Sequence, residues 1–170
     1  MGGEWWAILV TAWVGGVTGV FLNLVKEAIQ RRERIRMDLI SRQIRHYAWA
    51  DEGKGRLTTV PFRSSAHVLH MELDLRWINS SRTAIHLEEV SLLLFPGRLQ
   101  LKIPCHDRKL GQPVSDLRIP AGEAVNSRLS VAVTRWEEGA VFLKPDPVSM
   151  RLTVTTSRGH HWSFRLAPLA

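Results

Sequence analysis

The chain has 170 residues, with 23 lysines and arginines against 16 aspartates and glutamates and a formal net charge of +7. This length fits one modest domain plus a short segment and excludes a multidomain enzyme. A hydrophobic content of 45% with seven tryptophans is too apolar for a disordered basic tail, while 23% charged residues exclude a protein that lies mostly in a membrane.

The first long feature along the chain is an uncharged apolar run over residues 5–25. As a helix it would be about 31 Å long, which matches a hydrocarbon core of about 30 Å and predicts a transmembrane anchor over residues 1–25. The alternative is a buried helix of a soluble domain. Residues 1–4 contain no basic side chain, so a cleaved signal peptide is not expected.

Both ends of this run carry residues that favour the membrane surface. We expect the tryptophans at its start and the basic residues behind it to contact lipid headgroups: Trp5, Trp6, Lys26, Arg31, Arg32, Arg34 and Arg36. The basic cluster places the rest of the chain in the cytoplasm by the positive-inside rule. The single cysteine, Cys105, cannot form an internal disulfide, which agrees with a reducing compartment.

Small residues and one amide share a single face of the predicted membrane helix. They are Ala12, Gly15, Gly16, Gly19 and Asn23. Small residues four apart let two helix backbones approach closely, and an amide can hydrogen-bond across such a contact. This face predicts a homo-oligomer or a contact with a partner helix.

Residues 26–49 contain neither proline nor glycine, and apolar residues recur at three- and four-residue steps at Met37, Ile40, Ile44 and Tyr47. This spacing predicts an amphipathic helix that continues the membrane helix, within a basic juxtamembrane helix and linker over residues 26–56.

From residue 57 onward the periodicity is twofold. Apolar and polar residues alternate over residues 67–78, 99–103, 129–134 and 148–156, with turn sequences between them. Seven or eight short strands over residues 57–170 predict an all-β antiparallel sandwich, for which we expect an immunoglobulin-like topology without the cysteine pair of antibody domains. A small barrel is the alternative.

Three stretches of this pattern, residues 75–85, 119–123 and 154–159, follow an N-terminal apolar span. In this arrangement the chain resembles uncharacterised bacterial single-pass membrane proteins with a small β-sandwich. The resemblance implies the fold and the membrane topology. It implies no activity, because these stretches consist of strands and turns without catalytic residues.

No spacing of potential catalytic or metal-binding residues predicts an active site, so we expect neither a metal nor another cofactor and no enzymatic activity. His67 and His70 lie three apart on a strand and point to opposite faces, where they cannot share a metal. No nucleophile motif or phosphate-binding glycine loop occurs outside the apolar run. The dispersed arginines do not indicate specific nucleic-acid binding. Asn79 begins a glycosylation acceptor, which matters only in a secretory compartment.

The sequence has strong signals for a membrane anchor and no recognisable catalytic motif. Together these favour a membrane-anchored, non-catalytic β-sandwich that binds another protein in the cytoplasm. Three alternatives stay open at this point: an extracytoplasmic adhesion module, a structural subunit of a larger membrane or phage-related assembly, and an enzyme built on the sandwich.

Overall fold

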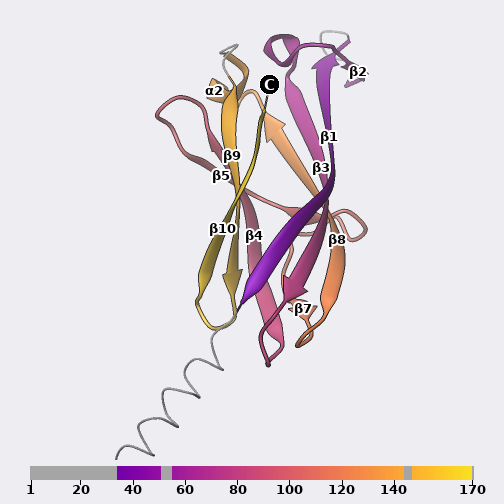
Figure 1. The fold of residues 1–170 in the computed structure, drawn as a ribbon. Coiled ribbons are helices and arrows are strands. Elements are labelled where there is room, and N and C mark those ends of the chain that lie inside the picture. The colour runs from indigo at the N-terminus through magenta and orange to yellow at the C-terminus, as the bar shows by residue number, and fades with distance from the viewer. Residues whose placement is uncertain (1–33, 51–54, 144–146, 170) are drawn as a thin grey trace, which may run out of the picture.

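Two antiparallel sheets form the body of the protein, and the sheets pack face to face (Figure 1). The computed structural model describes residues 34–50, 55–143 and 147–169. The first sheet has the order β2-β1-β3-β8-β6, with the bounds Leu57–Thr59, Ile35–Trp49, Val68–Asn79, Ala124–Thr134 and His106–Asp107. The second has the order β10-β9-β4-β5, with the bounds His161–Leu169, Val148–Thr156, Ile85–Phe95 and Leu101–Pro104. A further strand, β7 (Leu117–Ile119), pairs with one end of β4.

The strand order is that of an immunoglobulin-type sandwich. In immunoglobulin lettering, the first sheet has the order A-B-E-D over β1-β3-β8-β6. The second sheet has the order G-F-C-C′ over β10-β9-β4-β5. Among the described strands, none of one sheet pairs with a strand of the other. This part of the chain is therefore a sandwich rather than a barrel.

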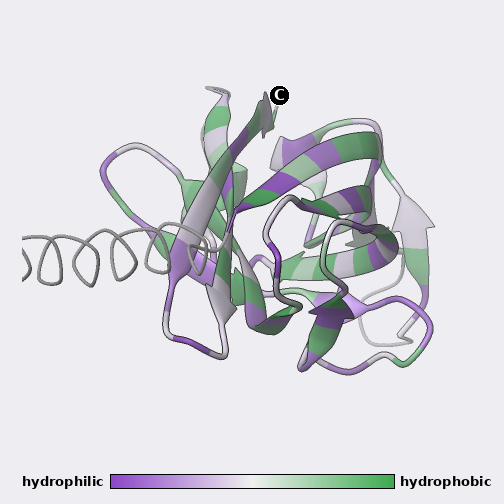
Figure 2. Cartoon of the chain, turned by 60° about the horizontal axis from the view of Figure 1, so that its bottom comes forward, coloured by the Kyte–Doolittle hydropathy of each residue, from purple (hydrophilic) through white to green (hydrophobic). Residues whose placement is uncertain are grey.

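The alternating pattern of the strands explains the core. In β3 every second side chain, from Leu69 to Trp77, is fully buried between the sheets, and the residues between them face outward. β8, β9 and β4 contribute equivalent rows, and Figure 2 shows the resulting alternation of hydrophobic and hydrophilic residues along the strands. The indole of Trp77 crosses the gap and meets the ring of Phe164 edge-on, with 6.0 Å between the ring centroids.

The predicted fold class is wrong, because the described residues of the expected amphipathic helix form a strand instead. The residues from Ile35 to Trp49 form β1, which pairs with β3 along almost its whole length. A bulge between Leu39 and Ser41 shifts the register by one residue, so Met37 and Ile44 both face the core although they lie seven apart. The spacing of apolar residues that resembled a helical stripe is therefore a twofold strand pattern interrupted by a bulge. The sandwich accordingly starts ahead of residue 57.

The predicted transmembrane helix over residues 5–25 lies outside the described residues. Among the residues that the structure does describe, no helix has the length and apolar character needed to cross a bilayer. Two short helical turns occur there, the 3₁₀ turn η1 (Arg63–Ser65) and α2 (Ala140–Leu143).

Candidate interaction site

Several large apolar side chains are exposed on the segments that lie at one end of the sandwich, where β1 ends and β8 leads into α2. We call this group the apolar end; it consists of Trp49, Leu57, Phe62, Trp136 and Leu143. Trp136 is 64% exposed, Phe62 69% and Leu143 75%. Single exposed apolar residues are ordinary on protein surfaces, whereas exposed apolar residues that contact one another, as Trp49 and Trp136 do, make a surface a candidate for binding.

Two tryptophans form the centre of the apolar end. The rings of Trp49 and Trp136 stack with their centroids 6.4 Å apart and their planes 12° from parallel. The ring of His67 lies 6.3 Å from that of Trp136. Because each ring restricts the other, the pair has little side-chain freedom to lose when it is covered, which lowers the entropic cost of binding.

The turn after β8 holds Trp136 in place. Glu138 closes this turn, since its carboxylate accepts a hydrogen bond from Thr134 N at 3.0 Å and its own N–H donates to Thr134 O at 2.9 Å. A side chain at Gly139 would place its Cβ 2.9 Å from the carbonyl oxygen of Arg135, so the turn requires glycine there. At the other side, Trp49 is fixed by the pairing of β1 with β2, opposite Leu57.

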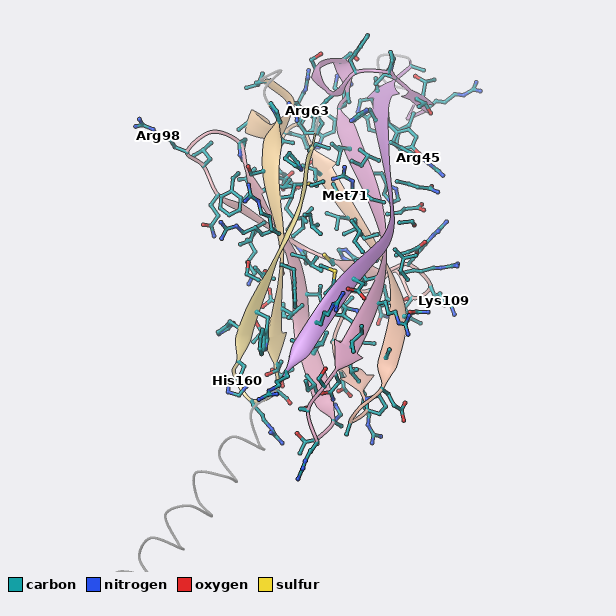
Figure 3. The ribbon with its side chains drawn as sticks, viewed as in Figure 1. Arg45, Arg63, Met71, Arg98, Lys109 and His160 are labelled. Atoms are coloured by element: carbon teal, nitrogen blue, oxygen red, sulfur yellow. The ribbon has the colours of Figure 1, made fainter. Side chains whose placement is uncertain are left out.

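η1 and α2 close the sandwich beneath the apolar end with two arginines. Arg63 is buried and donates a hydrogen bond to Leu169 O at 3.3 Å; Figure 3 shows it at the end of the molecule opposite to His160. Arg135 donates to Ser64 O, and its guanidinium lies 5.6 Å from the centroid of the buried Phe142 ring. The arginines thereby tie the helical turns and the last strand together and support the exposed rings.

Two histidines lie at the same end. Burial, together with the positive charge of Arg63, lowers the pKa of His46 below its usual value. His46 Nε2 and His67 Nδ1 are both buried without a hydrogen-bond partner in the described part of the chain. His46 is therefore held as the neutral imidazole at neutral pH.

Most residues predicted to contact lipid or a partner helix lie outside the described residues. These are Trp5, Trp6, Ala12, Gly15, Gly16, Gly19, Asn23, Lys26, Arg31 and Arg32. Arg34 and Arg36 are described and exposed, at the start of the first sheet, where Arg36 Nε lies 2.9 Å from Asp38 Oδ1. Their contact with lipid, the homo-oligomer and the cytoplasmic location all stay predictions.

His67, His70 and Cys105 lie in different surroundings. His67 lies at the apolar end, while the outward-facing His70 has its Nδ1 3.9 Å from Glu72 Oε1. Cys105 is fully buried, and its burial raises the pKa of the thiol to about 12, so it stays protonated at neutral pH. Across residues 34–50, 55–143 and 147–169, no three His, Cys, Asp or Glu side chains are grouped so that they could hold a metal ion.

Carboxylates of the two adjacent acidic pairs in the sequence, residues 88–89 and 137–138, make contacts with nearby strands and turns. Glu89 lies 2.7 Å from Lys102 Nζ and accepts a hydrogen bond from Ser91 Oγ at 2.8 Å, and these contacts lower its pKa. Glu137 and Glu138 accept hydrogen bonds from Thr134 in the turn already described.

A cavity of about 200 Å³ lies beside β8 under the loop from Asp107 to Leu117. Asp107 is bound to its own loop through the N–H groups of Lys109 and Leu110, and Asp116 lies 2.7 Å from His86 Nδ1. The carboxylates of this cavity are thus committed to holding the loop, which leaves the apolar end as the stronger candidate for recognition.

The apolar end could not be located from the sequence. The sequence pattern predicts a helix that ends at Trp49 and indicates no contact between Trp49 and Trp136. The two residues lie 87 positions apart, and only the folded structure brings them together. One signal was present: Trp136 directly precedes Glu137 and Glu138 in a turn segment, where a large ring has no alternating strand position that would bury it.

Comparison with known proteins reveals likeness in solved structures only. No family model matches the sequence, and no curated protein matches it. A candidate lipoprotein of Bacillus subtilis aligns with a TM-score of 0.45 at 10% identity, over 79% of this chain and 38% of that protein's length. A candidate ApaA protein of Bordetella pertussis aligns at 0.38 and 12% identity over 81% of this chain and 91% of that one. An uncharacterised β-sandwich protein of Clostridium difficile aligns at 0.38 and 9% identity, over 80% and 90% of the two chains.

Proposed function

We propose that this β-sandwich is a non-catalytic interaction module that binds a partner protein through its apolar end. The observation that carries the proposal is the exposed, stacked pair of Trp49 and Trp136, with the exposed Leu57 opposite Trp49 in the sheet. Tryptophan is among the residues that contribute most to protein–protein binding energy, and such residues cluster at the centre of interfaces.

The surroundings of the pair support binding rather than chemistry. The carboxylates nearest in the chain, Glu137 and Glu138, are engaged in the turn. The arginines beneath the surface bind backbone carbonyls. A rigid platform with an apolar centre is the usual anatomy of a protein interface.

Site-specific photo-crosslinking in the cells that make the protein tests this proposal. A photoreactive amino acid at position 143, within the apolar end, should yield a discrete crosslinked product with one partner protein. The same amino acid at position 82, in the exposed turn at the other end of the sandwich, is the matched control and should not yield that product.

Trp136→Ala should remove the crosslinked product from position 143 while the protein stays folded, because the Trp136 side chain is mostly exposed. The thermal unfolding midpoint of the variant provides the check on folding. Identical products from positions 143 and 82, or a product that survives in folded Trp136→Ala protein, would contradict the proposal.

A further inference from the structure

The last strand, β10, forms a long open edge of the second sheet. It occupies the end of the order β10-β9-β4-β5 and pairs only with β9 among the described strands. Edge strands are templates for the addition of another strand, and proteins usually keep them short. The strands at the other ends of the two sheets, β2, β6 and β5, have three, two and four residues, whereas β10 has nine. β1 is also without a ladder partner on one side ahead of Tyr47, among the described strands.

The first half of this edge has its backbone groups available. Thr156 N donates to His160 O at 3.0 Å, and in an antiparallel pair the residues bonded to the neighbour alternate with residues whose backbone groups point away from it. His161, Ser163 and Arg165 consequently direct their N–H and C=O groups outward from the sheet. We call residues 161–165 the free edge.

The second half of the edge is closed by side chains from β1 and η1. Arg42 of β1 donates to Ala167 O at 2.6 Å, and Arg63 donates to Leu169 O. The register shift between Leu166 and Leu169 also interrupts regular pairing there. An added strand is therefore limited to about the five positions of the free edge.

The side chains along the free edge distinguish its two faces. His161 and Arg165 are exposed on the outer face, and Arg165 lies opposite Arg151 of β9. Neither β9 nor β10 contains an acidic residue. Arg151 and Arg165 make the outer face next to the free edge basic, since Glu89 of β4, in the row of Thr155 and His161, is engaged by Lys102 at 2.7 Å.

The inner face is apolar and incompletely covered. Trp162 and Phe164 pack against the core but remain partly exposed. Across the open side of the sandwich, where β1 runs diagonally toward β10 in Figure 1, Met37 is also partly exposed and Leu39 is 37% exposed. A strand added at the free edge would place every second side chain over these partly exposed apolar residues.

A second copy of the chain fits this edge poorly. An antiparallel pair centred on Ser163 uses the whole free edge and sets His161 of each copy opposite Arg165 of the other. Neither side chain then meets a carboxylate, because β10 contains no acidic residue. Opposite charges across a strand pair are stabilising, so Arg165 is better matched by an acidic strand.

We propose that the free edge of β10 binds an extended acidic segment of a partner protein as an added β-strand. The segment alternates acidic residues, which face His161 and Arg165, with apolar residues, which cover Trp162 and Phe164. Backbone hydrogen bonds supply the affinity and the alternation supplies the specificity, as in other cases of strand addition. This surface lies apart from the apolar end, so the two proposals can be tested independently.

A synthetic peptide tests the proposal directly. The full chain is titrated against a fluorescein-labelled seven-residue peptide of alternating glutamate and valine, and binding is followed by fluorescence anisotropy. We expect saturable binding that weakens as salt is raised. A peptide of alternating lysine and valine, and one with the glutamates and valines in separate blocks, should bind at least about tenfold more weakly.

Two variants of Ser163 separate backbone pairing from side-chain contact. Ser163→Pro removes an outward N–H without removing a bond to β9, and should weaken binding by at least about tenfold. Ser163→Ala keeps the N–H and should bind like the original protein. Equal binding by folded Ser163→Pro and Ser163→Ala proteins, or equal binding of the alternating and block glutamate peptides, would overturn the proposal.

Charge reversal and self-association complete the test. The double change His161→Glu with Arg165→Glu should transfer the preference to the lysine peptide; an unchanged preference for the glutamate peptide would count against the assigned contacts. Sedimentation of the full chain should show no association that depends on Ser163. A dimer that Ser163→Pro dissociates would assign the edge to a second copy instead.

Discussion

The amide of Asn79 joins two segments that lie far apart in the sequence. Its Nδ2 donates to Thr83 O at 2.8 Å, to Ile119 O at 3.1 Å and to Pro120 O at 3.0 Å, while its Oδ1 accepts from Ser81 N at 2.9 Å. The side chain is buried. The acceptor motif that begins at Asn79 therefore cannot be glycosylated in the folded protein, and its residues instead build the turn between β3 and β4.

Asn79→Ala should lower the free energy of unfolding by about 2–4 kcal/mol, because it removes the donor from three partly or fully buried carbonyl contacts. Urea unfolding followed by tryptophan fluorescence measures this change. Ser80→Ala, at the exposed neighbouring position, is the control and should change the free energy by less than about 0.5 kcal/mol. A loss as small for Asn79→Ala as for Ser80→Ala would show that these bonds contribute little.

His46 makes stability depend on pH in a defined direction. Its pKa is lower in the folded protein than in the unfolded chain, chiefly through burial and further through the charge of Arg63. Its contribution to stability is complete above the unfolded value of about 6.5 and declines as the pH falls from there toward the folded value. Between about pH 7.5 and pH 5.5 the urea midpoint should fall.

His46→Gln should make that fall smaller, because the variant has no proton to gain at this position. The comparison uses the difference between the midpoints at the two pH values, so that other groups common to both proteins cancel. An identical pH dependence in the two proteins would show that His46 does not titrate in this range.

At the scale of elements, β1 shows where local sequence patterns mislead. Apolar residues at three- and four-residue steps favour a helix, yet a β-bulge in a strand can produce the same spacing. Pairing with β3 buries Ile44 against the core and turns Tyr47 to the outer face, opposite Val68. The contacts with β3 that decide between helix and strand come from residues more than twenty positions away. The local spacing of apolar residues contains no information about them.

This placement separates two residues that a helix would put on one face. Ile44→Asp should lower the free energy of unfolding by about 3 kcal/mol or more, since it directs a charge toward the core. Tyr47→Asp should lower it by less than about 1 kcal/mol. Chemical denaturation of both variants provides the measurement, and equal losses would favour the helical arrangement of this segment.

At the scale of the whole molecule, the two sheets depend on one shared core. The inward rows of β3 and β8 face those of β4 and β9, and Leu92 lies fully buried in β4. Leu92→Ala should cost about 2–5 kcal/mol, because a close-packed interior does not collapse fully around the missing atoms. Leu110→Ala, at a position that is 72% exposed, is the matched control and should be nearly neutral.

Unfolding monitored separately by fluorescence and by circular dichroism should give one coincident transition in both variants. Two transitions would indicate sheets that unfold independently.

The sequence by itself determined that the described part of the chain after residue 57 consists mainly of antiparallel strands, because alternation and turn residues act over a few positions and are visible in the order of the amino acids. Only the tertiary structure decided that the segment from Ile35 to Trp49 joins them as a strand, that Trp49 meets Trp136, and that β10 is left with an open edge. Each of these depends on pairing between distant segments, and the free energy of such pairing comes from burial and hydrogen bonds that exist only once the sheets have assembled.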